Sequence, residues 1–216
     1  MPRHTASRLK SVLFAASLAL SASLSATLAG PSLAADDLKT AIFAGGCFWC
    51  VESDFDHVNG VVETISGYSG GTTTRNVTYE NHTAAKHLEV VKITYDSSKV
   101  SYDELLDVFW RSVDPTDAGG QFCDRGHSYT TAIYTLNDKQ AKIAKASKEA
   151  LDKAGTLGKP IATEIAPAGP FFAAETYHQD YYNKNPVRYR YYRFACGRDK
   201  TIERLWGDQA HRGIEK

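Results

Sequence analysis

The stretch Gly45-Gly46-Cys47-Phe48-Trp49-Cys50-Val51-Glu52 decides how this chain begins to fold. It follows a short apolar run over residues 40–44, which predicts a buried strand. The two glycines indicate a turn. After them, apolar residues recur every three or four positions, as on one face of a helix: Phe48, Val51, Phe55 and Val58. The sequence therefore predicts a strand, a tight turn and a helix, with Cys47 in the first turn of that helix.

This position favours a reactive thiol. Unpaired backbone N–H groups and the positive end of the helix dipole stabilise a thiolate, so we expect the pKa of Cys47 to lie below its ordinary value of about 8.5. The glycines allow a ligand to approach the backbone, and the rings of Phe48 and Trp49 can form the walls of an apolar pocket. Together with the second thiol, Cys50, these features indicate redox chemistry on a small apolar group.

Composition narrows the classes of function. The chain has 216 residues, enough for one core of ordinary size. Its 25 basic and 25 acidic residues balance, so no general attraction to nucleic acid or membrane lipid is expected. Residues 188–194 interleave Arg with Tyr and Phe, as some nucleic-acid binders do. In a neutral chain we interpret them instead as a tail that lies across the domain and carries Cys196 towards Cys47.

The N-terminus has the pattern of a secretory signal peptide. Three basic residues precede an uncharged run rich in Ala, Leu and Ser over residues 11–35, and Ser32-Leu33-Ala34 has the small-x-small form of a cleavage site. An uncleaved membrane anchor is the alternative, which the high serine content disfavours. We therefore expect a signal over residues 1–34, a single catalytic domain over residues 35–216, and an exported protein, periplasmic or secreted.

The rest of the chain mixes short strands with helices. Strands are predicted over residues 61–68, 88–95, 130–134 and 161–165. Helices are predicted from Ser101, where Glu104 completes a capping box, from about residue 137 to 154, and over residues 173–182. From about residue 183 the periodicity is lost, so we expect a long irregular C-terminal tail. This mixture predicts an α+β two-layer domain.

The position of Glu89 and the loop before Tyr129 both suggest a functional role. Glu89 lies on the apolar face of its strand beside Val91 and Ile93, where an unpaired carboxylate is costly to bury. The loop that contains Asp124 and leads to Tyr129 is polar, Gly-rich and long for a simple connection, although a capped helix end followed by turns would also explain it. His178 by itself indicates a hydrogen-bonded structural histidine.

The cysteines leave several functions open. An exported protein meets an oxidising compartment, in which Cys47, Cys50, Cys123 and Cys196 can form disulfides. A zinc site from these four, or with His127, would need a second close pair of ligands, which the sequence lacks. The alternatives are therefore a thioredoxin-like thiol-disulfide oxidoreductase and a zinc- or disulfide-stabilised binding module.

Several segments, in one order, resemble peptide methionine sulfoxide reductase of the A type, from residue 41 to about residue 206. They are Gly46-Cys47-Phe48-Trp49 with Glu52, Ser66–Gly71, His87–Val91, Asp114-Pro115-Thr116, Gln121–Tyr129, Thr163-Glu164-Ile165 and Tyr177-His178-Gln179. The resemblance implies an α+β sandwich around a mixed, mainly antiparallel sheet. One segment departs from the family pattern: residues 83–87 replace a Gly-x-Thr-Gly-His turn that is about two residues longer.

The resemblance also implies the reaction, which is reduction of methionine S-sulfoxide, free and protein-bound, through a cysteine sulfenic acid and an intramolecular disulfide. It implies no metal or bound cofactor, a thioredoxin-like external reductant and a monomer. The implied site residues are Cys47 as nucleophile, Phe48 and Trp49 as pocket walls, Glu89 as acid, Tyr79 and Tyr129 as its helpers, and Asp124 as a residue that orders the site. A carboxyl on an apolar strand face has a raised pKa and can donate a proton at neutral pH.

The resolving thiol has two candidates. Cys196 matches the family's C-terminal resolving position, and some members use the position of Cys50. Because a pair three residues apart within a helical turn bridges only with local distortion, we prefer Cys196 on a mobile tail. Cys123 receives no role.

Overall fold

The computed structural model describes residues 37–215. The predicted signal peptide, residues 1–34, lies outside the described residues. Among the helices within residues 37–215, none combines the length and apolar character needed to cross a membrane.

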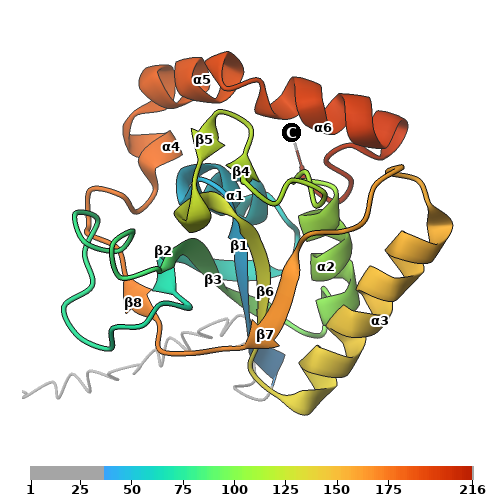
Figure 1. Ribbon diagram of the computed structural model, residues 1–216, viewed down its shortest axis with the longest axis horizontal. Coiled ribbons are helices and arrows are strands. Elements are labelled where there is room, and N and C mark those ends of the chain that lie inside the picture. The colour runs from blue at the N-terminus through green and yellow to red at the C-terminus, as the bar shows by residue number, and fades with distance from the viewer. Residues whose placement is uncertain (1–36, 216) are drawn as a thin grey trace, which may run out of the picture. The chain divides into compact units, whose positions relative to one another are not determined.

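A six-stranded sheet organises the domain (Figure 1). Its strands follow the order β7-β6-β1-β3-β2-β8, and every neighbouring pair is antiparallel except β6 and β7. The expected mixed, mainly antiparallel sheet is therefore confirmed. The strands are β1 (Leu38–Gly45), β2 (Val61–Ser69), β3 (Leu88–Asp96), β6 (Thr131–Thr135), β7 (Glu164–Pro167) and β8 (Phe172–Ala173).

Helices cover one face of this sheet. The main core lies between that face and α1 (Phe48–Asp56), α2 (Tyr102–Trp110) and α3 (Asp138–Ala154). Local signals set the starts of two helices: Ser101 forms the predicted capping box with Glu104, and Asn137 caps α3. The opposite face has a smaller apolar cluster, covered by the segment that links β7 to β8, including Phe171. The predicted two-layer α+β architecture is thus confirmed.

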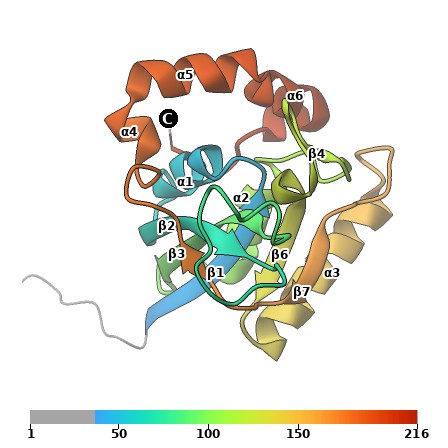
Figure 2. The same ribbon diagram turned by 60° about the vertical axis from the view of Figure 1, so that its left-hand side comes forward.

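The C-terminal part is mainly helical from Tyr181 onwards, so the prediction of a long irregular tail was wrong. The helix predicted over residues 173–182 was also wrong, because turns follow β8 up to residue 180. The C-terminal part forms α4 (Tyr181–Lys184), α5 (Pro186–Ala195), α6 (Arg198–Trp206) and a final turn, Gly207–Gln209. Figure 2 shows α5 passing above α1, with α6 continuing to the right of it. The apolar periodicity of α5 is weak because this helix is held in place by one buried ring, Tyr189, and by the polar contacts of Arg193. Pro186 at the first helical position was the available start signal.

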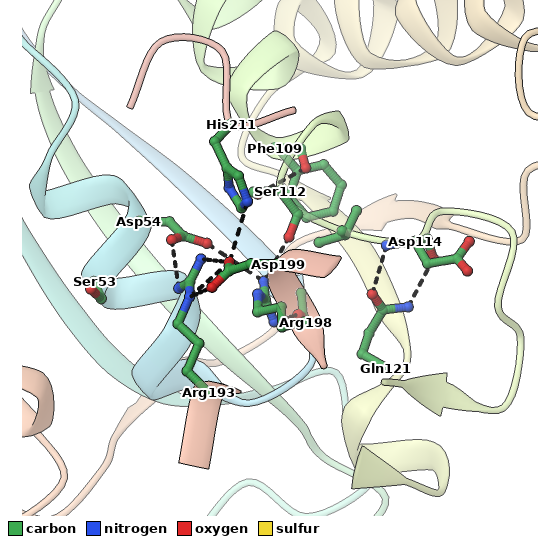
Figure 3. A network of polar contacts seen from close by, with 12 residues as sticks. Ser53, Asp54, Phe109, Ser112, Asp114, Gln121, Arg193, Arg198, Asp199 and His211 are labelled. Carbon is green, nitrogen blue, oxygen red and sulfur yellow. Dashed lines mark hydrogen bonds and ion pairs between the residues drawn. The ribbon is translucent and has the colours of Figure 1, made fainter. Parts of the chain in front are cut away.

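A small hairpin sits between α2 and β6 and presents the predicted polar loop to the turn before α1. Its strands are β4 (Gly120–Gln121) and β5 (Asp124–Arg125), and a 3-10 turn, His127–Tyr129, follows. Gln121 is buried and anchors the hairpin by accepting a hydrogen bond from the Asp114 N–H and donating one to the Asp114 carbonyl (Figure 3). Gly46 has φ +82°, and a Cβ there would lie 2.6 Å from the Gln121 Cβ. Position 46 therefore needs glycine, both for its backbone angle and for the approach of this hairpin.

Candidate active site

A cavity of about 100 Å³ brings together side chains from six parts of the chain. Its lining residues are Cys47, Phe48, Trp49, Tyr79, Glu89, Asp124, Tyr129 and Tyr192. Every residue predicted as a catalytic or pocket residue is among them, whereas Tyr192 was missed. Larger hollows exist, including one of about 490 Å³ beside Asp56, but that one has no thiol on its walls. Chemistry, and not size, therefore identifies the site.

Cys47 is the N-cap residue of α1, and its side chain is only 6% exposed. Burial raises the pKa of the Cys47 thiol, and contact with the Cys50 thiol raises it further, as does Glu89 once it is ionised. This is opposite to the predicted direction. Removing a thiolate from water in a closed cavity outweighs its attraction to the helix N-terminus, so Cys47 rests as a neutral thiol.

Cys50 is the second thiol at this site, and it is 2% exposed. It belongs to the same buried cluster as Cys47, with Tyr181 and Tyr189. Hydrogen bonding to Cys47 lowers the pKa of Cys50, and the positive charges of Arg198 and Arg193 lower it further. Of the two neighbouring thiols, Cys50 is therefore the one whose thiolate is stabilised.

Glu89 points from β3 towards the start of α1. Its Oε2 accepts a hydrogen bond of 2.9 Å from the Phe48 N–H, and the side chain is buried. Burial raises the pKa of Glu89 to about 8, and the charges of Asp124 and Cys50 add to this, whereas the Phe48 N–H opposes it. The expectation of a raised pKa is confirmed. The carboxyl therefore carries a proton at neutral pH.

The aromatic walls are fixed by contacts behind them. The Trp49 indole N–H donates to Nδ1 of His178 over 3.0 Å, and the Trp49 ring stacks on Tyr181 with centroids 3.7 Å apart. Phe48 packs against the rings of Tyr68 and His178. Burial lowers the pKa of His178, so its ring is neutral and Nδ1 is free to accept. The structural role predicted for His178 is confirmed, since it orients Trp49.

Hydroxyl groups complete the cavity. Tyr79, 42% exposed, stands at its solvent side, and its backbone N–H donates to Glu175 over 2.9 Å. Burial raises the pKa of Tyr129, so its hydroxyl keeps its proton. The turn before Glu89, residues 83–87, is shorter than in the family pattern, yet Tyr79 and Tyr129 still line the cavity. This turn ends with Lys86 at φ +59°, in the left-handed region that glycine adopts more easily.

Tyr192 and Asp124 form the last wall of the cavity. The Tyr192 hydroxyl donates a hydrogen bond to Asp124 Oδ2, and Tyr192 lines the cavity together with Cys47. Tyr192 stands on α5, remote in sequence from the Cys47 turn. Its only sequence signal was its place in the aromatic and basic run over residues 188–194.

A buried charge network holds the C-terminal helices against α1 (Figure 3). Arg193 donates to Asp54 of α1 over 2.7 Å and to Asp199 over 2.6 Å. Arg198 donates to the carbonyl of Ser112 over 2.8 Å and to that of Gly45 over 3.2 Å, so α6 is tied directly to the turn before Cys47. The same two guanidinium groups act on the pKa of Cys50.

The four cysteines are in two chemical states. Cys123 and Cys196 form a disulfide, whereas Cys47 and Cys50 are free. In the alternative zinc site, Cys47 and Cys50 would bind one metal ion together with Cys123 and Cys196, with His127 as an alternative ligand. Within residues 37–215 the one group with metal-ligand spacing is Cys123, Asp124 and Cys196, whose two sulfurs are already bonded to each other.

Comparison with known proteins agrees with this site. The family model described as peptide methionine sulfoxide reductase matches residues 39–210. Peptide methionine sulfoxide reductase MsrA 2 of Rhizobium meliloti is 55% identical over 184 residues, which covers 85% of this chain and 91% of that protein. Mxr1 of Saccharomyces cerevisiae in reduced form has a TM-score of 0.65 at 30% identity, covering 72% of this chain and 90% of Mxr1.

Methionine sulfoxide reductase A of Corynebacterium diphtheriae has a TM-score of 0.62 at 35% identity, covering 70% of this chain and 76% of that one. The sequence match spans nearly all the described residues, and every residue that lines the site except Tyr79 and Tyr192 lies in a segment that suggested the resemblance. This chain belongs to the peptide methionine sulfoxide reductase family.

Proposed function

We propose that this protein reduces methionine S-sulfoxide, free and in proteins, to methionine, with Cys47 as the nucleophile. The observation that carries the proposal is that the Cys47 thiol and the buried Glu89 carboxyl line one small cavity with aromatic walls. Family membership supports the same reaction. A general thiol-disulfide oxidoreductase or a binding module would give the protonated Glu89 no task.

The aromatic walls bind the apolar end of the substrate. Phe48 and Trp49 contact the methyl group of the sulfoxide, because their rings are the large apolar surfaces of the cavity. The hydrogen bond from Trp49 to His178 holds the indole in place before substrate arrives. With the methyl group against these rings, the sulfoxide oxygen faces the acidic and hydroxyl groups opposite.

Glu89 activates the oxygen. A sulfoxide oxygen leaves sulfur only when it is protonated or strongly hydrogen-bonded. Glu89 has a pKa of about 8 and therefore has a proton to donate at neutral pH. The hydroxyls of Tyr79 and Tyr129 line the same cavity and donate hydrogen bonds to the oxygen. Asp124 orders this side through its hydrogen bond with Tyr192.

Cys47 then attacks the activated sulfur. The Cys47 sulfur bonds to the substrate sulfur, and the oxygen then passes to Cys47, so that the sulfur–oxygen bond of the substrate breaks and one to Cys47 forms. The new sulfur–sulfur bond breaks at the same time, the thioether leaves as methionine, and Cys47 carries the oxygen as a sulfenic acid. In total a thiol and a sulfoxide become a sulfenic acid and a thioether, with no net gain or loss of protons. Cys47 supplies the two electrons that reduce the substrate.

Cys50 is the thiol placed to resolve the sulfenic acid in this state. It contacts Cys47, whereas the thiol preferred from sequence, Cys196, is bonded to Cys123. Cys47 is an N-cap residue with ψ 118°, outside helical geometry, so the distortion that a bridge within a helical turn requires is reduced. The Cys50 thiolate attacks the Cys47 sulfur, water leaves, and a disulfide forms.

We further propose that the enzyme works after export with a thioredoxin-like reductant. The signal pattern in residues 1–34, which lie outside the described residues, supports export. An enzyme that ends each cycle as a disulfide needs an external dithiol, and in an oxidising compartment that dithiol must come from a dedicated reducing system.

Substrate epimers test the proposal directly. Residues 35–216 are incubated with dabsylated methionine S-sulfoxide or R-sulfoxide and dithiothreitol, and methionine is measured by chromatography. We expect turnover of the S form alone and its loss in Cys47→Ser. Turnover of neither epimer would contradict the proposed function. Activity of Cys47→Ser close to that of the parent protein would contradict the role of Cys47.

A further inference from the structure

We propose that Cys123 is the terminal thiol of a disulfide relay in this enzyme: the oxidation that begins at Cys47 ends as the Cys123–Cys196 disulfide, and a protein dithiol reduces it there. The inference rests on the proposed function and extends it. It gives a role to the one cysteine that the sequence left without one.

Access separates the inner and outer sulfurs. Cys47 and Cys50 are buried, beneath the aromatic residues of α4 and α5. Cys123 is exposed at the tip of the two-residue turn between β4 and β5, and Cys196 is half-buried at the end of α5. A protein dithiol has to bring its own sulfur into line with the disulfide it attacks. The outer disulfide offers such an approach in the conformation described.

The two pairs of thiols are nonetheless close. The Cys196 Sγ lies 3.8 Å from Asp124 Oδ2, and the same oxygen accepts the hydrogen bond from Tyr192. Tyr192 in turn lines the same cavity as Cys47. One carboxylate and one phenol therefore separate the outer disulfide from the reactive thiol.

Helix α5 supplies a route for exchange. Tyr192 and Cys196 are four residues apart, and the Cys196 N–H donates to the Tyr192 carbonyl over 2.9 Å, so both side chains lie on one face, one turn apart. A displacement of α5 by about one turn, roughly 5.4 Å, would bring Cys196 to the place that Tyr192 occupies beside Cys47. In the conformation described, Cys196 is bonded to the loop residue Cys123, which is the thiol to which it returns.

The chemistry balances without a further oxidant. Each sulfoxide leaves a Cys47–Cys50 disulfide and one water. The Cys196 thiolate attacks that disulfide, forms a mixed disulfide and releases one inner thiolate, and the Cys123 thiolate then attacks Cys196 and releases the other. The inner pair gains two electrons, the outer pair loses two, and protons pass from the attacking to the leaving thiols. The product is the state described here, with free Cys47 and Cys50 and a bonded outer pair.

The test counts oxidising equivalents. Fully reduced enzyme, residues 35–216, is freed of reductant under argon and mixed with excess methionine S-sulfoxide, and disulfides are mapped by mass spectrometry. We expect two methionines per chain and two disulfides, Cys47–Cys50 and Cys123–Cys196. If Cys123 is still a thiol when methionine formation ends, the relay is wrong. If no methionine forms at all, the proposed function itself fails.

Variants separate a relay from a structural staple. With a purified bacterial thioredoxin, its reductase and NADPH, we expect Cys123→Ser to lower kcat at least tenfold. With dithiothreitol, which is small enough to reach the inner pair, kcat should stay within twofold, as should the rate of the first methionine. Arg125→Gln, on the same hairpin, should leave all three unchanged. Full thioredoxin-driven activity in Cys123→Ser, or an equal loss with both reductants, would overturn the inference.

Discussion

Replacing Glu89 by Gln tests the acid step most directly, because it keeps the shape of the side chain and removes the proton that it donates. With a pKa of about 8, about nine in ten Glu89 carboxyls are protonated at pH 7. At the ordinary value of 4.5 the fraction would be about one in 300. The buried site therefore makes roughly 300-fold more acid available. General acid catalysis contributes about 10²- to 10⁴-fold, so Glu89→Gln should lower the rate of methionine formation by that factor near pH 7.

The pH dependence of this factor tests whether Glu89 acts as the proton donor. Titration of Cys47 affects both proteins, so we expect it to cancel largely in the ratio of the wild-type rate to the Glu89→Gln rate. That ratio should be level up to about pH 7 and fall about tenfold per pH unit above about pH 8, as Glu89 loses its proton. The ratio falls, and does not rise, with pH because the protonated form of Glu89 is the active one.

The assay is a single turnover of pre-reduced enzyme, quenched at intervals, with methionine measured by chromatography from about pH 6 to 9.5. Omitting an external reductant removes its own titration from the data. Glu164→Gln, an exposed residue on β7, is the matched control and should follow the wild type. A ratio that stays constant across the whole range, or that is near one at pH 7, would refute the role of Glu89 as proton donor.

Three further outcomes follow from the same contacts. The folded pKa of Glu89 lies above its ordinary value, so the free energy of unfolding should decline as pH rises from about 4.5 to 8, by on the order of 4 kcal/mol, and urea titrations should find this decline smaller in Glu89→Gln. Arg193→Met removes the main partner of the buried Asp54 and should cost about 3–5 kcal/mol of unfolding free energy, measured in the same way. Trp49→Phe removes the hydrogen bond to His178 and should lower kcat/KM about tenfold, with unfolding monitored to separate this loss from instability.

Local rules were enough for most of the fold. The start of α2 followed from Ser101 and Glu104, and the strand–turn–helix unit around Cys47 followed from two glycines and a three-to-four residue spacing. The alternation of β3 placed Glu89 on the buried face, where the structure has it. These predictions succeeded because each depends on residues a few positions apart.

The failures involve partners that are far apart in sequence. Helix α5 was missed because Arg193 anchors it to Asp54, 139 residues away, and an arginine does not register as a core position. The Cys123–Cys196 pair spans 73 residues, and neither residue has a local signature. Tyr192 reaches the site only because α5 crosses above α1. Hydrophobic periodicity cannot report contacts of this kind.

The wrong direction for the pKa of Cys47 has a consequence for the mechanism. Burial keeps both Cys47 and Glu89 neutral, and the reaction conserves protons overall, since a thiol and a sulfoxide become a sulfenic acid and a thioether. A cavity of about 100 Å³ can therefore begin and end the proposed step uncharged. In that proposal Glu89 gives its proton to the oxygen as the Cys47 sulfur bonds to the substrate, and regains one from the thiol. A resting thiolate would add an unpaired charge to a buried site, which is costly. Burial therefore raises the pKa of both groups: it weakens Cys47 as a free nucleophile and makes Glu89 a proton donor. In the proposed step the second effect compensates for the first.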